Sequence, residues 1–391
     1  MRNIRRMRKL LKAYKIEIKL TEEQKLKVNK TIGTCRFIYN LYLQKNKEEY
    51  ELNKKFISGF DFSKWLNNDF IKQNPSYSWI KDVSSKAVKQ SIMNGDKAFK
   101  SFFKGLSKFP RFKKKKDMIG IYFPKNNETD FTLERHRIKV PTIGFVRFKE
   151  FGYIHLNSKI KSGTITKNAD KYFISILVEE EKEKTNKINN HEGLGIDLGL
   201  KDFAIISNKQ SFKNINKSVK IKKLEKSLKR QQRSLSRKFE NKKRKRGETA
   251  NNIQKNILKI QRLHIRLTNI RTEYLKFVVN SMVKLSPKFI TIEDLNVRGM
   301  MKNRHLSKAI SKQNFYYFRM FLTQQCNKNN IELRVVDRWF PSSKTCNCCG
   351  QIKTDLKLKD RVYKCDCGYE EDRDLNASYN LRDCSIYKIA N

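Results

Sequence analysis

Three acidic residues in the C-terminal half of the chain have the types and settings that metal-dependent chemistry requires. Asp197 lies in the apolar run GLGIDLGLKDFAIIS, Glu293 ends the run FITIE, and Asp374 precedes LNASYNLR. Burying a carboxylate in such a run costs roughly several kcal/mol unless a cation or hydrogen bonds offset it. Three such groups on separate elements predict a site for divalent metal. Two metal ions there would activate water and stabilise the leaving oxygen of a phosphodiester.

Each of these residues also has a plainer interpretation or a rival. Asp197 would suit a turn, because glycines flank it on both sides. Asp294 competes with Glu293, and the alternation of the run does not decide between them. Asp374 would suit the N-cap of a helix, and Asp372 competes for its metal role. The residues alone leave these alternatives open.

A cluster of cysteines, CNCCGQIKTDLKLKDRVYKCDCG, occupies residues 346–368. Two pairs, C-x2-C and C-x-C, are each followed by a glycine that lets backbone N–H groups turn back on a thiolate. Four thiolates suit a tetrahedral structural Zn²⁺. The predicted ligands are Cys346, Cys349, Cys365 and Cys367. Cys348 is a rival without a following glycine, and the C-x-C pair is shorter than usual.

The charge balance points to a polyanionic partner. Lys and Arg number 87 against 39 Asp and Glu, which gives a net charge of +48. This excess favours nucleic acid, because phosphates neutralise Lys and Arg and release counterions. No run approaches the ~20 apolar residues of a spanning helix, and no secretory signal is visible, so we expect no membrane partner. Clustered cysteines favour a reduced compartment and a cytoplasmic location.

Hydrophobic periodicity divides the chain into regions of different character. Residues 12–20 alternate like a strand, and a capping box at Thr21 and Gln24 opens a helical region over 21–105, with Gly33 as a break. Strand-like runs follow to about residue 190 and predict a small β-barrel that includes 12–20. From 193, the order of two strands, a basic helical hairpin, strand, helix and strand fits an RNase H-like core.

The motifs resemble those of the TnpB family, the transposon-encoded RNA-guided nucleases of bacterial insertion sequences from which type V CRISPR effectors descend. GIDLGLKDFAIIS is similar to the first RuvC motif of that family, and ITIEDLNVRGM to the second. TCNCCG…YKCDCGYEEDRDLNAS is similar to its zinc ribbon and third motif. The resemblance spans nearly the whole chain, in order. It implies that the catalytic acids are Asp197, Glu293 and Asp374 rather than their neighbours.

The resemblance also implies a multidomain α+β architecture. A wedge β-barrel would comprise residues 1–20 and 106–190, with a helical recognition domain at 21–105 inserted into it. A RuvC nuclease domain would comprise 191–340 and 371–391, with a zinc ribbon at 341–370.

The expected function is RNA-guided, Mg²⁺-dependent DNA cleavage. A guide RNA derived from the transposon end would pair with double-stranded target DNA beside a short adjacent motif, on the nucleoid of a bacterium. The same element would encode a partner transposase. Two alternatives remain: a compact type V CRISPR effector, and a binding-only RNA-guided repressor. The three acids count against the repressor.

Overall fold

A computed structural model describes residues 7–183, 191–244, 250–357 and 360–390. The chain divides into two compact units, 1–184 and 185–391. Each unit has its own sheet and its own hydrophobic core.

The first unit is built on a seven-stranded antiparallel sheet in the order β2-β6-β7-β1-β5-β4-β3. The N-terminal strand β1 lies between β7 and β5, so the segment expected to open the sheet does belong to it. No pairing joins the edge strands β2 and β3 among the described residues, and closure into a barrel stays a prediction. The strands are β1 (Met7–Lys19), β2 (Gly120–Pro124), β3 (Thr132–Leu133), β4 (Arg137–Val140), β5 (Gly144–Phe148), β6 (Lys159–Asn168) and β7 (Lys171–Glu183).

Helices fill the stretch between β1 and β2. Thr21 and Gln24 form the predicted capping box at the start of α1. The expected break at Gly33 was wrong, because α1 runs through it and packing of the helix against α4 outweighs the low helix propensity of one glycine. The helices are α1 (Glu22–Asn53), α2 (Gly59–Trp65), α3 (Ile71–Gln73) and α4 (Ser85–Phe103).

The second unit has a six-stranded mixed sheet in the order β10-β9-β8-β11-β12-β15. The central strands β8, β11 and β12 are parallel, and β9 returns antiparallel to β8, as the RNase H-like order predicts. These strands are β8 (Leu194–Leu198), β9 (Asp202–Ile206), β10 (Ser211–Lys213), β11 (Phe289–Glu293), β12 (Glu332–Val336) and β15 (Lys388–Ile389).

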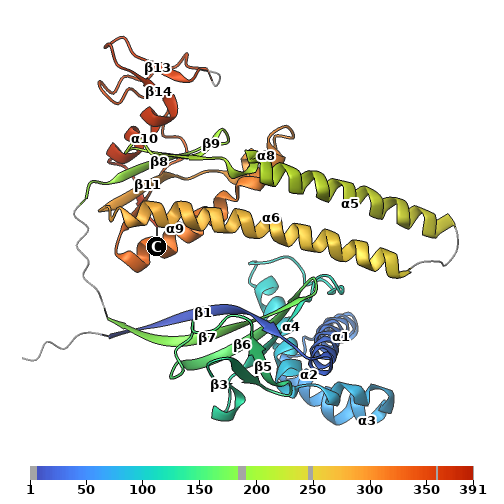
Figure 1. Cartoon of the computed structure of the whole chain (residues 1–391). Coiled ribbons are helices and arrows are strands. Elements are labelled where there is room, and N and C mark those ends of the chain that lie inside the picture. Colours follow the sequence, from blue (N-terminus) through green and yellow to red (C-terminus); the bar gives the residue numbers. More distant parts are fainter. Residues whose placement is uncertain (1–6, 184–190, 245–249, 358–359, 391) are drawn as a thin grey trace, which may run out of the picture. The chain divides into compact units, whose positions relative to one another are not determined.

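Two helical layers cover this sheet. Helices α6 and α9 pack on one face and α10 on the other, and α5 lies beside α6 as the predicted hairpin (Figure 1). A small ribbon, the β13–β14 hairpin, lies at the start of α10. The elements are α5 (Val219–Arg244), α6 (Ala250–Lys284), α7 (Val297–Met300), α8 (Ser307–Gln313), α9 (Phe315–Asn329), α10 (Arg373–Asp383), β13 (Val362–Lys364) and β14 (Glu370–Asp372).

Alternation along the central strands decides what each face carries. Leu194 and Ile196 of β8 join the core beneath α6 and α9. Gly195 and Asp197 therefore point to the α10 face, since successive side chains in a strand alternate. Gly195 lets α10 approach closely, because a Cβ there would lie 1.9 Å from the carbonyl oxygen of Ser378.

We expect Gly195→Ala to destabilise the second unit by several kcal/mol, roughly, because the methyl group overlaps the α10 backbone and the helix must move. Thermal unfolding would measure this. Gly33→Ala is the matched control: its Cβ meets no atom within 4 Å and it lies inside α1, so it should stabilise by about 0.5–1 kcal/mol. Equal unfolding temperatures for Gly195→Ala and the wild type would contradict the close approach.

Candidate metal and nucleic-acid site

Two of the predicted acids lie on neighbouring strands at the same edge of the sheet. Parallel pairing sets Ile196 opposite Ile292, so that Asp197 and Glu293 follow at equivalent positions of β8 and β11. Ile292 lies in the core under α6 and α9, and alternation turns Glu293 to the α10 face with Asp197. Asp197 is thus in a strand rather than in a turn. Asp374 lies in the first turn of α10, the helix packed on that face.

The electrostatics of Asp197 reflect this convergence. Burial, followed by the negative charges of Glu293 and Asp374, raises the pKa of its carboxyl to about 8. Burial likewise raises the pKa of Glu293, against a lowering hydrogen bond from Ser342. Carboxylates that repel one another in a poorly solvated place are the setting a divalent cation relieves. The donor set of carboxylate oxygens fits Mg²⁺, and its role as ligand stays a prediction.

The two rival acids, Asp294 and Asp372, each form other contacts. Asp294 forms ion pairs with Arg319 of α9 at 2.7 Å and with Arg338 at 2.5 Å, and hydrogen bonds from these two arginines lower the pKa of Asp294. Asp372 is the N-cap of α10 and accepts hydrogen bonds from the backbone N–H groups of Asp374 and Leu375. The cap expected as an alternative role for Asp374 therefore belongs to Asp372.

Sequence reasoning missed the partners that hold the acids. The hydroxyl of Ser342 donates to Glu293 Oε1, and Ser342 is buried. Two arginines approach Asp374: Arg373 at 3.1 Å and Arg361, from the segment before β13, at 3.6 Å. No motif signalled these contacts; the only available sign was that Ser342 lies close before the first cysteine pair.

Two asparagines of α10 tie the cysteine segment to the acids. The side-chain amide of Asn380 donates to the carbonyl oxygens of Ser342 and Thr345, both at 2.7 Å. Asn376 donates to the same Thr345 carbonyl at 2.8 Å and accepts from the backbone N–H of Asn347 at 3.2 Å. Both asparagines are buried. The turn that carries the first cysteine pair is therefore fixed directly to the helix that carries Asp374.

The four predicted cysteines come together. Their sulfur atoms all lie within 4.8 Å of one another: Cys346, Cys349, Cys365 and Cys367. Two sulfur pairs are 3.7 and 3.6 Å apart. Tetrahedral Zn²⁺ with Zn–S bonds of about 2.3 Å requires an S···S distance of about 3.8 Å. The group therefore fits structural zinc, whereas Cys348 lies outside it and is exposed.

The glycines after each pair make the predicted turns. Gly350 and Gly368 have φ values of 75° and 87°, the left-handed conformation that glycine adopts without strain. The backbone N–H of Cys367 donates to the Cys365 sulfur, which is the largest cause that lowers the pKa of that thiol to about 7. The thiols of Cys349 and Cys367 have raised pKa values, in part because they hydrogen-bond to the neighbouring sulfurs.

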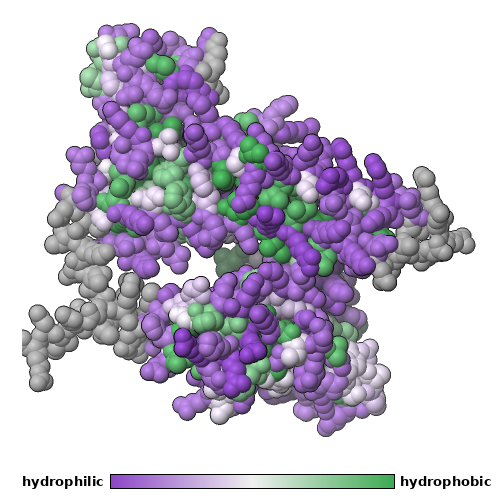
Figure 2. Space-filling view, viewed as in Figure 1, coloured by the Kyte–Doolittle hydropathy of each residue, from purple (hydrophilic) through white to green (hydrophobic). Residues whose placement is uncertain are grey.

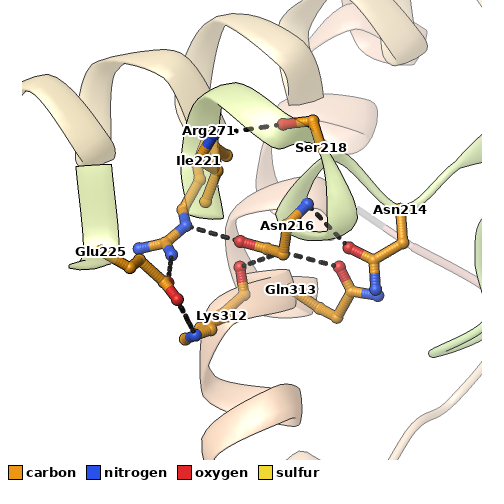
Figure 3. Close-up of polar contacts among 8 residues, drawn as sticks. All are labelled: Asn214, Asn216, Ser218, Ile221, Glu225, Arg271, Lys312 and Gln313. Carbon is orange, nitrogen blue, oxygen red and sulfur yellow. Dashed lines mark hydrogen bonds and ion pairs between the residues drawn. The ribbon is translucent and has the colours of Figure 1, made fainter. Parts of the chain in front are cut away.

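A network of hydrogen bonds and ion pairs, called here the polar joint, connects both arms of the helical hairpin to α8 and to Asn216 (Figure 3). Arg271 of α6 bridges Glu225 of α5 and Asn216, at 2.7 and 2.8 Å. Lys312 at the end of α8 also pairs with Glu225, at 2.6 Å. The neighbouring Gln313 donates to the Gly199 carbonyl at 3.1 Å. The joint therefore connects the hairpin to the β8–β9 turn.

The first arm of the hairpin presents a basic face. A groove of about 750 Å³ along α5 is lined by polar and cationic side chains, and seven of its ten residues are Lys or Arg: Lys223, Lys226, Ser227, Lys229, Arg230, Arg233, Ser234, Arg237, Lys238 and Asn241. Hydrophilic residues dominate the visible surface of this arm in Figure 2. Such a row of cations suits a phosphate backbone. No helix in the described ranges is long and apolar enough to cross a bilayer.

Comparison with known proteins identifies the family. Three family models match in order along the chain: a "Helix-turn-helix domain" of OrfB_IS605 at 7–55, the "Probable transposase" OrfB_IS605 at 175–304, and the "Cas12f1-like, TNB domain" at 315–381. The matched models and the relatives described below support membership of the TnpB family. The match at 315–381 covers the four cysteines and Asp374.

Relatives extend over nearly the full length. The chain is 29% identical to the Escherichia coli K12 protein named "Putative RNA-guided DNA endonuclease InsQ", over 95% of this chain and 92% of that protein. It is 28% identical to a "Putative RNA-guided DNA endonuclease" of Streptomyces pristinaespiralis, over 96% and 89%. Its fold is similar to that of Cas12f1 in a complex with sgRNA and target DNA, with a TM-score of 0.56, 12% identity and coverage of 97% and 100%.

The cysteine group predicts about one zinc per chain, coupled to folding of the ribbon. Cys349→Ser should lower the zinc content of the purified protein and raise proteolysis within 346–368, because three thiolates hold the metal poorly. Cys348→Ser is the control on the adjacent residue and should leave both unchanged. Elemental analysis and limited proteolysis measure the outcome; an effect of Cys348→Ser equal to that of Cys349→Ser would contradict the ligand set.

The raised pKa of Asp197 predicts a pH-dependent stability in Mg²⁺-free, zinc-loaded protein. The Asp197 carboxyl of the folded protein keeps its proton up to about pH 8, whereas in the unfolded chain it loses the proton near the ordinary aspartate pKa of 3.8. The contribution of this group to the free energy of unfolding is therefore greatest below the pKa of the unfolded carboxyl. It is lost as pH rises through about 8.

Asp197→Asn keeps the shape and removes the charge, so it should raise the unfolding temperature at pH 8.5 and change it little near pH 4. Thermal scans across this range measure the difference. A variant less stable than the wild type at pH 8.5 would show that charge repulsion does not dominate at this position.

Proposed function

We propose that this chain is an RNA-guided DNA endonuclease of the TnpB type, in which Asp197, Glu293 and Asp374 hold the catalytic metal ions. The observation that carries the proposal is that three carboxyl groups approach one another on one face of the sheet, where burial, followed by the charges of Glu293 and Asp374, raises the pKa of Asp197 to about 8. The names of its full-length relatives support the activity. When bound, Mg²⁺ would activate water and stabilise the charge on the leaving oxygen.

The residues around the acids have supporting roles in this proposal. Ser342 orients the Glu293 carboxylate through its hydrogen bond. Arg361 and Arg373 hold Asp374 in place by ion pairs. The ribbon at 341–370 would hold one structural zinc. Through its contacts with α10, it would also fix the position of Asp374 relative to Ser342.

The partners follow from charge and from the family. Guide RNA from the transposon end would specify double-stranded target DNA by base pairing, beside a short adjacent motif. We assign motif and guide recognition to a wedge domain at 1–20 and 106–190 and a helical domain at 21–105. Cleavage would belong to a RuvC domain at 191–340 and 371–391. The protein would act in the cytoplasm, on the nucleoid, beside a transposase of the same element.

Two alternatives to this proposal differ from it in the encoding locus or in the chemistry of the acidic site. A compact type V CRISPR effector would use the same site, and the encoding locus, array or transposon, separates the two. A binding-only repressor would not require three converging carboxylates, so their retention favours the nuclease.

Alanine at any one of the three acids should lower cleavage of guide-matched duplex roughly a hundredfold or more while guided binding persists, because metal ligation is lost but no basic surface is. Cleavage and binding are measured on the same preparations. Asp372→Asn is the control: asparagine also caps α10, so cleavage should remain close to the wild-type rate. A near wild-type rate for Glu293→Ala would refute the assignment.

The same assay tests dependence on RNA. Matched duplex with Mg²⁺ is incubated with the protein at fixed ionic strength, with and without guide RNA. Site-specific cutting should require the RNA. RNA-free protein should bind DNA without sequence preference and lose affinity steeply as salt rises. Equal site-specific cutting without RNA would favour a protein-read endonuclease instead.

A further inference from the structure

Trp339 projects from the loop that follows β12, and its side chain is 85% exposed, more than any other large apolar residue in the described part of the chain. Tryptophan is highly buried on average, because exposing its ring leaves a large apolar area in water. An aromatic ring held this far in solvent is typical of a binding surface.

The loop that carries Trp339 is fixed at both ends to the C-terminal end of β11, the strand that carries Glu293. Before it, Arg338 pairs with Asp294, the residue next to Glu293. After it, Ser342 bonds to Glu293 itself. Only two residues, Phe340 and Pro341, lie between Trp339 and Ser342, so the Cα atoms of Trp339 and Ser342 are within about 11 Å of each other. Trp339 therefore stands at the rim of the acidic site.

The loop is also internally ordered. The backbone N–H of Trp339 donates to Asp337 Oδ1 at 2.9 Å, and that of Phe340 donates to the Asp337 carbonyl at 3.1 Å. Phe340 packs inward against Val336 and Leu381. With Phe340 anchored in the core, the neighbouring ring is directed outward by a fixed backbone. Binding a flat ligand on Trp339 would thus require little ordering of the loop.

We propose that Trp339 is a stacking platform for a nucleobase of the single DNA strand that enters the acidic site. The inference rests on the proposed nuclease function and adds a substrate-binding residue to it. Stacking of an unpaired base on the indole would fix the strand so that its adjacent phosphate lies over Asp197 and Glu293. Stacking is tolerant of sequence, since every base has a flat π-face.

The surroundings favour a nucleobase over a protein side chain. Arg319 and Arg338, both more than two-fifths exposed, lie beside the acidic strand end and pair with Asp294. Each guanidinium has five donors, and one carboxylate does not use them all, so both can meet phosphates on either side of a stacked base. The net charge of +48 further disfavours most proteins as the partner and favours a polyanion.

A fluorescence titration without Mg²⁺ tests the contact directly. The full chain is titrated with a single-stranded thymidine oligonucleotide and with an abasic oligonucleotide of the same length and charge. We expect indole quenching with the thymidine strand only, and its loss in Trp339→Leu. The difference between the two proteins reports Trp339 alone, because the other two tryptophans, Trp65 and Trp79, lie in the first unit and are common to both.

Cleavage gives the second readout. Trp339→Leu should lower kcat/KM for guide-matched duplex about tenfold, the size of one lost base stack, whereas Trp339→Phe should retain most of it. Zinc content and unfolding temperature should not change. Ile386→Ala, a truncation at an 82% exposed position outside this loop, is the control and should cut normally.

The outcomes separate the inference from the function it rests on. Quenching by the abasic strand, or normal cleavage by Trp339→Leu, would overturn the stacking platform while leaving the nuclease intact. Loss of cleavage with no change in Trp339 fluorescence would also overturn it. If no preparation cuts matched DNA with guide RNA, the nuclease proposal fails, whatever the titration shows.

Discussion

The second unit depends on one steric constraint, the contact between the backbone of α10 and the backbone of β8 at Gly195. A side chain there would meet the Ser378 carbonyl at 1.9 Å, so glycine alone permits the approach. The approach brings Asp374 to the face that already carries Asp197 and Glu293. The fold thereby concentrates acidic groups at a cost to stability, which the ion pairs of Asp374 with Arg361 and Arg373 offset only in part. This cost to stability is what a bound divalent cation would offset.

Two sets of buried polar contacts extend this constraint to the periphery. Asn376 and Asn380 of α10 hold the turn before the first cysteine pair, so a zinc-stabilised ribbon would also stabilise the helix that bears Asp374. On the other side, Arg271 and Gln313 link the hairpin to the β8–β9 turn. Nucleic acid bound along α5 would thus contact a hairpin that is linked to β8, the strand that carries Asp197. Buried polar networks of this kind fix geometry, since breaking one partner leaves another unpaired.

Local patterns predicted much of this molecule. The capping box of α1 and the strand pair around Asp197 are short-range features, and the structure has them. The cysteine spacing predicted four converging sulfurs, because the glycine turns are encoded next to the cysteines. Gly33 was the failure: a local propensity of about 1 kcal/mol was overridden by packing of α1 against α4. Closure of the first sheet is still a prediction, since no pairing joins its edge strands β2 and β3 among the described residues.

The sequence by itself determined which residue types are present, their periodicity and hence the RNase H-like order, and through family motifs it pointed to Asp197, Glu293 and Asp374. Only the tertiary structure showed what the two rival acids contact: Asp294 is held by Arg319, and Asp372 caps a helix. It alone revealed Ser342 and the exposed ring of Trp339. The reason is physical: periodicity and spacing are properties of neighbours along the chain, whereas ion pairs, caps and exposure depend on segments that meet only after folding.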